Sequence, residues 1–344
     1  MTTNTAAGGP AEPGPSATVP VIDAHQHYWR FGEADQSAWR TPAHRAIERD
    51  YGPADLAPEL SVCGVDATVL MQSVDEPAEN DRLRDYARAA GTVAGVVGWL
   101  PLSDPEAARA EWQRADTTAW CGVRTLIGRD PLAWLADPAV LDLFGDLARE
   151  GLVWDVVPIT AEQVAAVARL AETVPELRLV VDHLSRPPLD SGAWQPWADQ
   201  VAELARCPGV ACKVSVGVDA LTAWSRWQPE VLRPYVAHVL DSFGPGRLML
   251  ASNWPVVLLR ATYAQAWADL TAALVGAGAQ AADLSQITGG TAERWYRLGP
   301  VTAAAFDGVK QQTTTTQHGE RGKRHERRDR ETVRGIAGGG RSGR

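Results

Sequence analysis

Eight short segments rich in β-branched and apolar residues alternate with longer segments rich in Ala, Leu, Glu and Arg, and this alternation constrains the fold more than any other feature. Segments of the first kind predict β-strands and those of the second predict helices. Strands that alternate with helices pair in parallel through right-handed crossovers. We predict strands at Val19–His25, Ala67–Gln72, Val93–Trp99, Gly122–Ile127, Leu152–Val157, Arg178–Leu184, Val210–Ser215 and Arg247–Ser252.

Helices are expected between these strands, and several begin at a recognisable start signal. Thr160 precedes Ala161, and Asp104 precedes Pro105, a residue that suits the first turn of a helix. The count of eight strands favours a single-domain (β/α)8 TIM barrel, an α/β fold, over an open sheet. Functional residues of such barrels lie at the C-terminal ends of the strands. The expected helices are Glu79–Ala90, Pro105–Arg114, Pro138–Arg149, Ala161–Ala171, Trp197–Ala205, Pro229–Phe243, Tyr263–Val275 and a closing helix near Thr291–Tyr296.

The 344 residues accommodate one barrel at 19–300, with disordered extensions expected at 1–18 and 301–344. The first extension is poor in bulky apolar residues, and the second is Gln/Thr-rich, then rich in basic residues and Gly. The start of the chain lacks the basic and apolar regions of a signal peptide. No apolar run approaches the ~18 residues that span a bilayer. A soluble, cytoplasmic protein is expected.

Charge and cysteine content narrow the classes of partner. The net charge is −9, but residues 310–344 carry +6, so the remaining chain carries −15. A body that acidic repels phosphate, which argues against nucleic acid as a partner. The four cysteines form no CxxC motif and are expected to be reduced, without a structural zinc site. We expect a small-molecule substrate, no membrane partner, and a monomer or homodimer.

Histidines mark two of the predicted strand ends. His25 and His27 follow the first strand and share one face, because side chains alternate along a strand. Two imidazoles on one face of a barrel mouth suit a divalent metal, although simple packing or exposure would also explain them. His183 ends the sixth strand. His44, in a long loop, and His238, in a polar helix, are expected at the surface.

The strand-end motifs taken together resemble the amidohydrolase superfamily, specifically its amidohydrolase-related (amidohydrolase 2) group. That group includes L-fuconolactonase, L-rhamnonolactonase and 2-pyrone-4,6-dicarboxylate lactonase. The resemblance spans about residues 19–300, with its motifs in the same order. They are Asp23-Ala24-His25-Gln26-His27, Cys121-Gly122-Val123-Arg124, Val181-Asp182-His183, Lys213-Val214-Ser215, the stretch from Arg247 to Pro255, and Gly289 to Tyr296.

The resemblance implies a distorted (β/α)8 barrel in which His25, His27 and His183 surround a reacting carbonyl. It also implies that the residue after strand eight activates water. Here Asn253 stands where the family usually has Asp. An amide cannot take a proton, although its carbonyl oxygen can orient water. The catalytic residues are therefore expected to be His183, as the base, and Asn253.

A divalent metal, Zn or Mn, is one expectation for the cofactor, and no cofactor is the other. His25 and His27, with His183, are the expected ligands, and an ion there would lower the pKa of bound water. The site has few carboxylates, so it would hold a metal more weakly than a His/His/His/Asp site. No candidate for a bridging carboxylated lysine follows strand four.

Substrate contacts are expected from polar and aromatic residues near the strand ends. The Arg124 guanidinium, among apolar neighbours, could fork onto a carboxylate or the lactone oxygens, or it could pair with Asp155 on strand five. Aromatic planes suit the flat face of a sugar ring or an aromatic lactone. The candidates are Arg124, Gln72, Lys213, Asp155, Trp29 and Trp254.

The function predicted from these residues is hydrolysis of a cyclic ester, a sugar or small organic-acid lactone, by water in a His-rich barrel mouth. One alternative is metal-dependent decarboxylation of an aromatic or unsaturated acid, which related barrels perform. The other is a non-catalytic binding barrel, which the amide at Asn253 permits.

Overall fold

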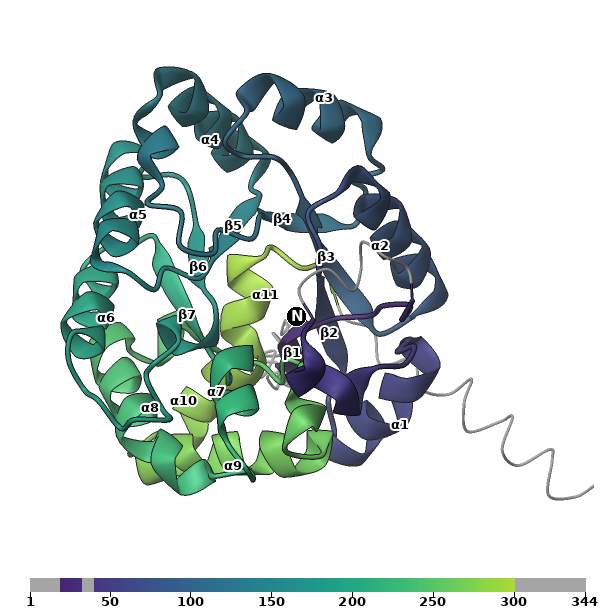
Figure 1. The fold of residues 1–344 in the computed structure, drawn as a ribbon, viewed down its shortest axis with the longest axis vertical. Helices are drawn as coiled ribbons and strands as arrows, with labels where there is room; N and C mark the ends of the chain where they lie inside the picture. Colours follow the sequence, from purple (N-terminus) through teal and green to yellow (C-terminus); the bar gives the residue numbers. More distant parts are fainter. Residues whose placement is uncertain (1–18, 33–39, 301–344) are drawn as a thin grey trace, which may run out of the picture. The chain divides into compact units, whose positions relative to one another are not determined.

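The computed structural model describes residues 19–32 and 40–300, and a sheet of eight parallel strands forms its centre (Figure 1). The strands lie in chain order around the sheet, so each strand pairs with the one that precedes it in the sequence. The extensions predicted at 1–18 and 301–344 lie outside the described residues. The strands are β1 (Ile22–Gln26), β2 (Ala67–Met71), β3 (Val93–Trp99), β4 (Trp120–Arg124), β5 (Val153–Val156), β6 (Leu179–Val181), β7 (Val210–Val214) and β8 (Leu248–Leu250).

The sheet closes just beyond the end of β8. Gln26 of β1 forms a parallel bridge with Trp254, whose carbonyl oxygen accepts from the His27 N–H at 2.7 Å. The Asn253 N–H donates to the His25 carbonyl oxygen at 2.9 Å. The register of the β1–β2 pair shifts between Asp23 and Gln26, so the barrel is distorted. The predicted (β/α)8 fold is confirmed.

Most predicted strands end beyond the observed ones, four of them by one or two residues and two of them by three. The segment predicted at Arg178–Leu184 leaves the sheet after Val181, because the backbone turns left-handed at His183. The segment predicted at Gly122–Ile127 ends at Arg124, where the Leu126 N–H turns to donate to the Asp75 carboxylate. Both departures bring polar side chains to the rim of the barrel.

The helices surround the strands, and most follow the predicted bounds (Figure 1). A helix at Pro53–Cys63 was not predicted, although Gly52-Pro53 and Gly64 are start and stop signals. No helix within the described ranges is long and apolar enough to cross a membrane. The helices are α1 (Pro53–Cys63), α2 (Pro77–Ala89), α3 (Pro105–Arg114), α4 (Pro138–Glu150), α5 (Ala161–Thr173), α6 (Trp197–Ala205), α7 (Val218–Ala223), α8 (Pro229–Phe243), α9 (Tyr263–Gly276), α10 (Ala281–Ser285) and α11 (Thr291–Trp295).

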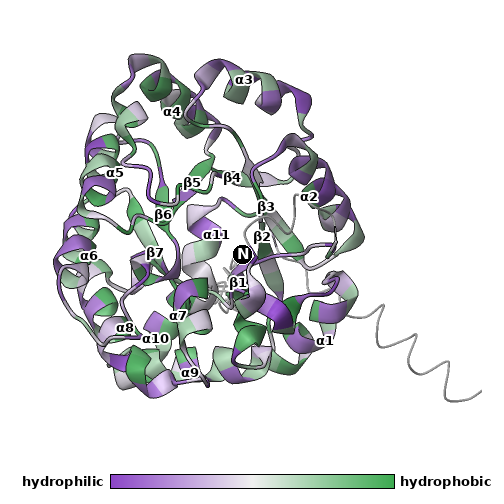
Figure 2. Cartoon of the chain, viewed as in Figure 1, coloured by the Kyte–Doolittle hydropathy of each residue, from purple (hydrophilic) through white to green (hydrophobic). Residues whose placement is uncertain are grey.

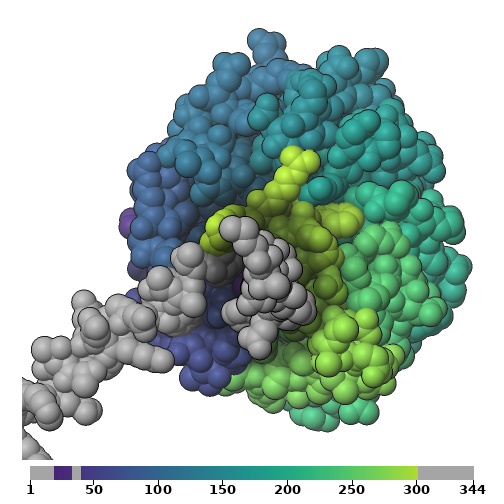
Figure 3. Space-filling view, turned by 180° about the vertical axis from the view of Figure 1, so that it is seen from behind, coloured from purple at the N-terminus to yellow at the C-terminus, as the bar shows by residue number. Residues whose placement is uncertain are grey.

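Apolar side chains pack both inside the barrel and between the strands and the helices. Figure 2 shows apolar residues on central strands such as β3 and β6, and mixed colouring on the surrounding helices. The inner core is small and includes Met71 and Met249, together with Ala292 and Tyr296 at the end of the described chain. Figure 3 shows this last segment near the centre of the rear face. Residues around α11 therefore fill the end of the barrel opposite the strand C-termini.

A glycine permits the residues before α11 to pack into this end of the barrel. A Cβ atom at Gly289 would lie 1.7 Å from the carbonyl oxygen of Pro20, so only glycine lets the two backbones approach so closely. The closed rear end leaves the C-terminal rim as the open mouth, where barrel enzymes carry their chemistry.

Candidate active site

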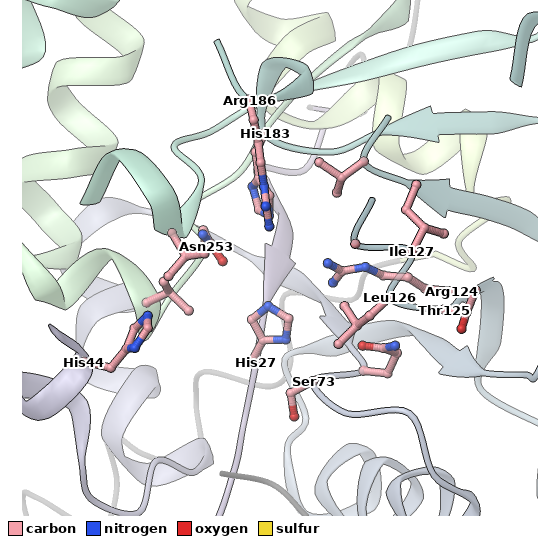
Figure 4. Close-up of a pocket in the computed structure, with 15 residues that line it drawn as sticks. His27, His44, Ser73, Arg124, Thr125, Leu126, Ile127, His183, Arg186 and Asn253 are labelled. Carbon is pink, nitrogen blue, oxygen red and sulfur yellow. The ribbon is translucent and has the colours of Figure 1, made fainter. Parts of the chain in front are cut away.

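A cavity of about 250 Å³ opens at the C-terminal rim of the barrel (Figure 4). Its described lining contains histidine, arginine, amide and hydroxyl side chains but no Asp or Glu. Apolar residues of the loops after β4, β5, β7 and β8 complete the wall. The polar lining residues are His27, His44, Gln72, Ser73, Arg124, Thr125, His183, Arg186 and Asn253.

His27 directly follows β1 and projects into the cavity, and His25 lies buried below it on β1. Their Nε2 atoms are 3.1 Å apart. In a neutral ring, His27 Nδ1–H donates to the Met71 carbonyl oxygen at 3.0 Å, which leaves His27 Nε2 as an acceptor. Burial, followed by the Arg124 guanidinium, lowers the pKa of His27 to about 3, so its ring is neutral at physiological pH.

The turn after β6 projects His183 into the cavity. The four residues His183–Arg186 all have positive φ, between 50° and 57°, although none is glycine. Such residues cost about 1–2 kcal/mol each and persist only where their surroundings fix them. The indole N–H of Trp197 donates to the Leu184 carbonyl oxygen at 2.7 Å, and the Arg186 N–H donates to the His183 carbonyl oxygen at 2.8 Å. The strained turn brings His183 and Arg186 to one wall.

The His183 ring is available as a proton acceptor. Its Nδ1 lies 2.8 Å from the Ser215 hydroxyl, and its centroid is 4.5 Å from that of His25. Burial holds the pKa of His183 well below its usual range. The Asp182 carboxylate raises this pKa in part, and the Arg124 guanidinium lowers it further. The imidazole is therefore neutral near pH 7.

A layer of buried charges lies beneath the histidines. Lys213 Nζ is 2.5 Å from Asp155 Oδ1, 3.0 Å from Asp182 Oδ1 and 3.3 Å from His25 Nδ1. Although burial opposes it, the charges of Lys213 and His25 hold the pKa of Asp182 well below its usual range. Burial raises the pKa of Asp155 to about 7. The layer fixes His25 from below.

Asn253 presents one acceptor atom to the cavity. Its backbone has φ = 56°, a conformation that Asn tolerates better than most residues. The side-chain amide N–H donates to the Val216 carbonyl oxygen at 2.9 Å. Oδ1 is then the atom left to accept a hydrogen bond from a ligand or a water molecule.

The residues predicted from sequence fall into three groups. His27, Gln72, Arg124, His183 and Asn253 line the cavity. His25, Lys213 and Asp155 lie in the buried layer below it, and Trp29 and Trp254 are buried in aromatic packing outside the described lining. The alternative pairing of Arg124 with Asp155 is wrong, because Lys213 takes Asp155 and the Arg124 Nε lies 3.5 Å from Asp182 Oδ2.

Four lining residues were missed. Ser73 directly follows the predicted strand end at Gln72, Arg186 lies two residues beyond the one at Leu184, and Thr125 lies inside the segment predicted as the fourth strand, so each was within reach of the sequence argument. The expected surface position of His44 is wrong: its side chain is buried and lines the cavity. The Thr41 N–H donates to His44 Nδ1 at 2.8 Å and fixes the ring, a contact that no sequence pattern indicates.

Three buried side chains form a candidate metal-binding group. His25, Asp182 and His183 offer ligand atoms within 4.8 Å of one another. Imidazole nitrogens and a carboxylate oxygen are the donors that divalent zinc prefers, so the group fits such an ion. The set shares His25 and His183 with the predicted ligands and adds Asp182.

Comparison with known families and curated proteins gives consistent matches. The family profile described as Amidohydrolase matches residues 22–298. A protein of Burkholderia ambifaria named L-fucono-1,5-lactonase is 33% identical over 288 residues, which cover 80% of this chain and 95% of the relative. Its namesake from Burkholderia multivorans is 32% identical over 303 residues, with 80% and 96% covered.

Solved structures agree with these matches. An amidohydrolase from Burkholderia multivorans with bound zinc has a TM-score of 0.73 and 30% identity, covering 81% of this chain and all of that one. The 2,6-dihydroxybenzoate decarboxylase from Rhizobium has a TM-score of 0.55 at 15% identity, covering 81% of this chain and 99% of that chain. The second likeness shows the fold alone.

Proposed function

This chain belongs to the amidohydrolase family, and from that premise we propose that its cavity hydrolyses the 1,5-lactone of a sugar acid. The chain is a lactone-ring hydrolase, in agreement with the two relatives that are named L-fucono-1,5-lactonase. L-Fucono-1,5-lactone, after which both relatives are named, is the first substrate to test. The decarboxylase alternative has only a likeness of fold behind it.

One observation carries the proposal: a neutral imidazole, an amide oxygen and a guanidinium face the same cavity (Figure 4). They belong to His183, Asn253 and Arg124. Ester hydrolysis needs a group that accepts a proton from water, a group that orients the water, and a cation near the carbonyl oxygen. The three side chains match these requirements in that order.

The mechanism follows from these roles. Water donates hydrogen bonds to His183 and to Asn253 Oδ1, and its oxygen attacks the lactone carbonyl carbon while His183 accepts the proton. The Arg124 guanidinium stabilises the negative charge that develops on the carbonyl oxygen. The acyl carbon–oxygen bond then breaks, and His183 returns the proton to the ring oxygen, which becomes a hydroxyl. The new acid ionises near pH 7, so each turnover releases one proton to solution.

We assign a divalent ion to the group of His25, Asp182 and His183, with His27 beside it. The similar amidohydrolase structure with bound zinc supports zinc as the first ion to test, with manganese as the second. When bound, the ion would polarise the carbonyl and lower the pKa of water. An ion on His183 would occupy the proposed base, so sensitivity to a chelator separates the two ways of activating water.

The test is proton release from L-fucono-1,5-lactone and a panel of sugar and aromatic lactones, measured with a pH indicator. Assays with a chelator and with added Zn²⁺ or Mn²⁺ separate the metal-assisted and metal-free routes. His183→Ala should reduce kcat by about 10²–10⁴-fold. His238→Ala, on α8 and outside the described lining, is the matched control and should keep its turnover.

Each other outcome has a defined meaning. Unchanged turnover in His183→Ala would reject the role of this residue. Release of carbon dioxide from acid substrates, without lactone opening, would favour the decarboxylase. A ligand that binds tightly but is never turned over would favour a non-catalytic barrel.

We further propose that the enzyme acts on a small molecule in the cytoplasm, where its cysteines remain reduced. All four of them, Cys63, Cys121, Cys207 and Cys212, are free thiols in the structure. Whether the chain is a monomer or a homodimer stays a prediction that size-exclusion chromatography with light scattering can test.

A further inference from the structure

Two arginines face the cavity from different elements (Figure 4). Arg124 ends β4, and its side chain extends toward the space between His27 and His183. Arg186 ends the left-handed turn after β6. Only Arg124 has a place in the mechanism proposed above. A second guanidinium at the same cavity calls for a separate explanation, because Arg186 is only partly exposed and a cation that is poorly paired is costly to remove from water.

Neither guanidinium is fully paired by the described residues. Arg124 makes one ion pair, from Nε to Asp182 Oδ2 at 3.5 Å, and no hydrogen bond with them. Arg186 Nε lies 3.4 Å from Asp219 and is a buried atom without a hydrogen bond in the described chain. A guanidinium has five N–H donors and commonly binds a carboxylate through two of them. Both arginines therefore keep donors for a ligand.

The surrounding charges favour an anion in this space. No acidic side chain occurs in the described lining of the cavity, and its other polar groups are neutral imidazoles, amides and hydroxyls. Burial is the main cause that lowers the pKa of Arg186, and the Asp219 carboxylate opposes it. The charge of Arg124 lowers this pKa further, because the two guanidiniums repel each other. An anion placed between the two guanidiniums would relieve both the repulsion and the missing hydrogen bonds.

We propose that Arg124 and Arg186 form a carboxylate-binding subsite that holds the product, a small hydroxycarboxylate, after the lactone has opened. The inference rests on the proposed function, because lactone hydrolysis turns a neutral ester into an anion inside this cavity. The substrate offers no full negative charge to the pair, whereas the product does. The enzyme therefore binds its product more tightly than its lactone, and the product inhibits it competitively.

The test compares two ligands that differ only at C1, where one has a carboxylate and the other a neutral hydroxymethyl group. Binding of L-fuconate and of the matched neutral alditol, L-fucitol, is measured by isothermal titration calorimetry with the full-length protein. L-Fuconate should bind at least tenfold more tightly, and its affinity should fall as salt rises. The product inhibition constant, from lactone turnover in the presence of L-fuconate, should lie below KM.

Variants assign the effect to the second arginine. Arg186→Gln should weaken L-fuconate binding about tenfold and leave L-fucitol binding unchanged, since a hydrogen bond to a charged group is lost. Arg186→Lys, which keeps the charge, should recover part of this loss and guards against misfolding of the first variant. The matched control is Arg88→Gln, an exposed arginine of α2 that pairs with Asp116 outside the cavity.

The outcomes separate this proposal from the proposed function. Arginine-dependent binding of L-fuconate without turnover of any lactone would support the subsite and reject lactone hydrolysis. Equal affinities for L-fuconate and L-fucitol would overturn the subsite, whatever the turnover. So would an Arg186→Gln variant that folds, as judged by circular dichroism, and binds L-fuconate as the wild type does.

Discussion

Replacing Ser252 by alanine should weaken the junction that closes the barrel. The Ser252 hydroxyl donates to Asp23 Oδ2 at 2.6 Å and accepts from the Trp254 N–H at 2.9 Å, and all three residues are buried. Asp23 belongs to β1, whereas Ser252 and Trp254 follow β8. One hydroxyl therefore connects the first strand to the last, between the backbone positions that carry His25 and Asn253.

The expected loss follows from the two bonds. A hydrogen bond to a charged group contributes about 1.5–3 kcal/mol, and a buried N–H left without an acceptor costs about 1–3 kcal/mol. Asp23 keeps three further donors, the Ser252 N–H at 2.9 Å, the Tyr263 hydroxyl at 3.1 Å and the His25 N–H at 3.2 Å. The two contributions add to about 2.5–6 kcal/mol. Because Asp23 keeps other donors, we predict a loss near the lower end, about 3 kcal/mol in the free energy of unfolding.

Urea unfolding followed by tryptophan fluorescence measures this quantity. The control is Ser61→Ala, the same substitution at an exposed position of α1, which should change the free energy of unfolding by less than about 0.5 kcal/mol. A loss in Ser252→Ala that stays below about 1 kcal/mol would refute the reasoning, because neither bond would then contribute as a buried bond does.

Three further predictions concern the rim and the rear of the barrel. Asn253→Asp should keep or raise lactone turnover in the indicator assay, and a total loss would mean that the amide itself is required. Burial raises the pKa of Asp75, so the native state binds its proton more tightly than the unfolded chain, and stability falls as pH rises through that pKa. From below the ordinary Asp pKa of about 3.9 up to neutral pH, wild-type protein should therefore lose more unfolding free energy in urea than Asp75→Asn, and parallel changes would contradict the shift. Gly289→Ala should cost at least about 2 kcal/mol in the same assay, because its Cβ would meet the Pro20 carbonyl oxygen, whereas Gly276→Ala, with no atom within 4 Å, should cost nothing.

The barrel could be predicted because its signal is repeated along the chain. Each strand and the helix that follows it repeat the same change in the spacing of apolar residues, from the spacing of a strand to that of a helix. Eight such pairs leave few topologies. The end of β6 could not be predicted in the same way. Leu184 and Ser185 have no preference for positive φ, and tertiary bonds such as that from Trp197 hold them there.

The rim residues of the site could be predicted from their positions, but their depth could not. Arg124 and His183 stand at or after strand ends, and the ends of parallel strands meet at one rim. Lys213 and Asp155 also precede strand ends, yet they lie below the cavity and pair with each other. Alternation gives the face of a strand on which a side chain lies, whereas height in the barrel depends on strand tilt and register. His44 is placed by packing of a distant loop.

The left-handed backbone at Asn253 has an evolutionary consequence. Asparagine and aspartate are both among the few residues with a side chain that adopt this conformation readily. Their codons differ by a single base. A lineage of such barrels can therefore exchange an amide for a carboxylate beside the reacting water in one mutational step, without straining the backbone. The exchange removes the hydrogen bond from the Asn253 amide to the Val216 carbonyl oxygen, so selection on water activation and selection on stability meet at this one side chain.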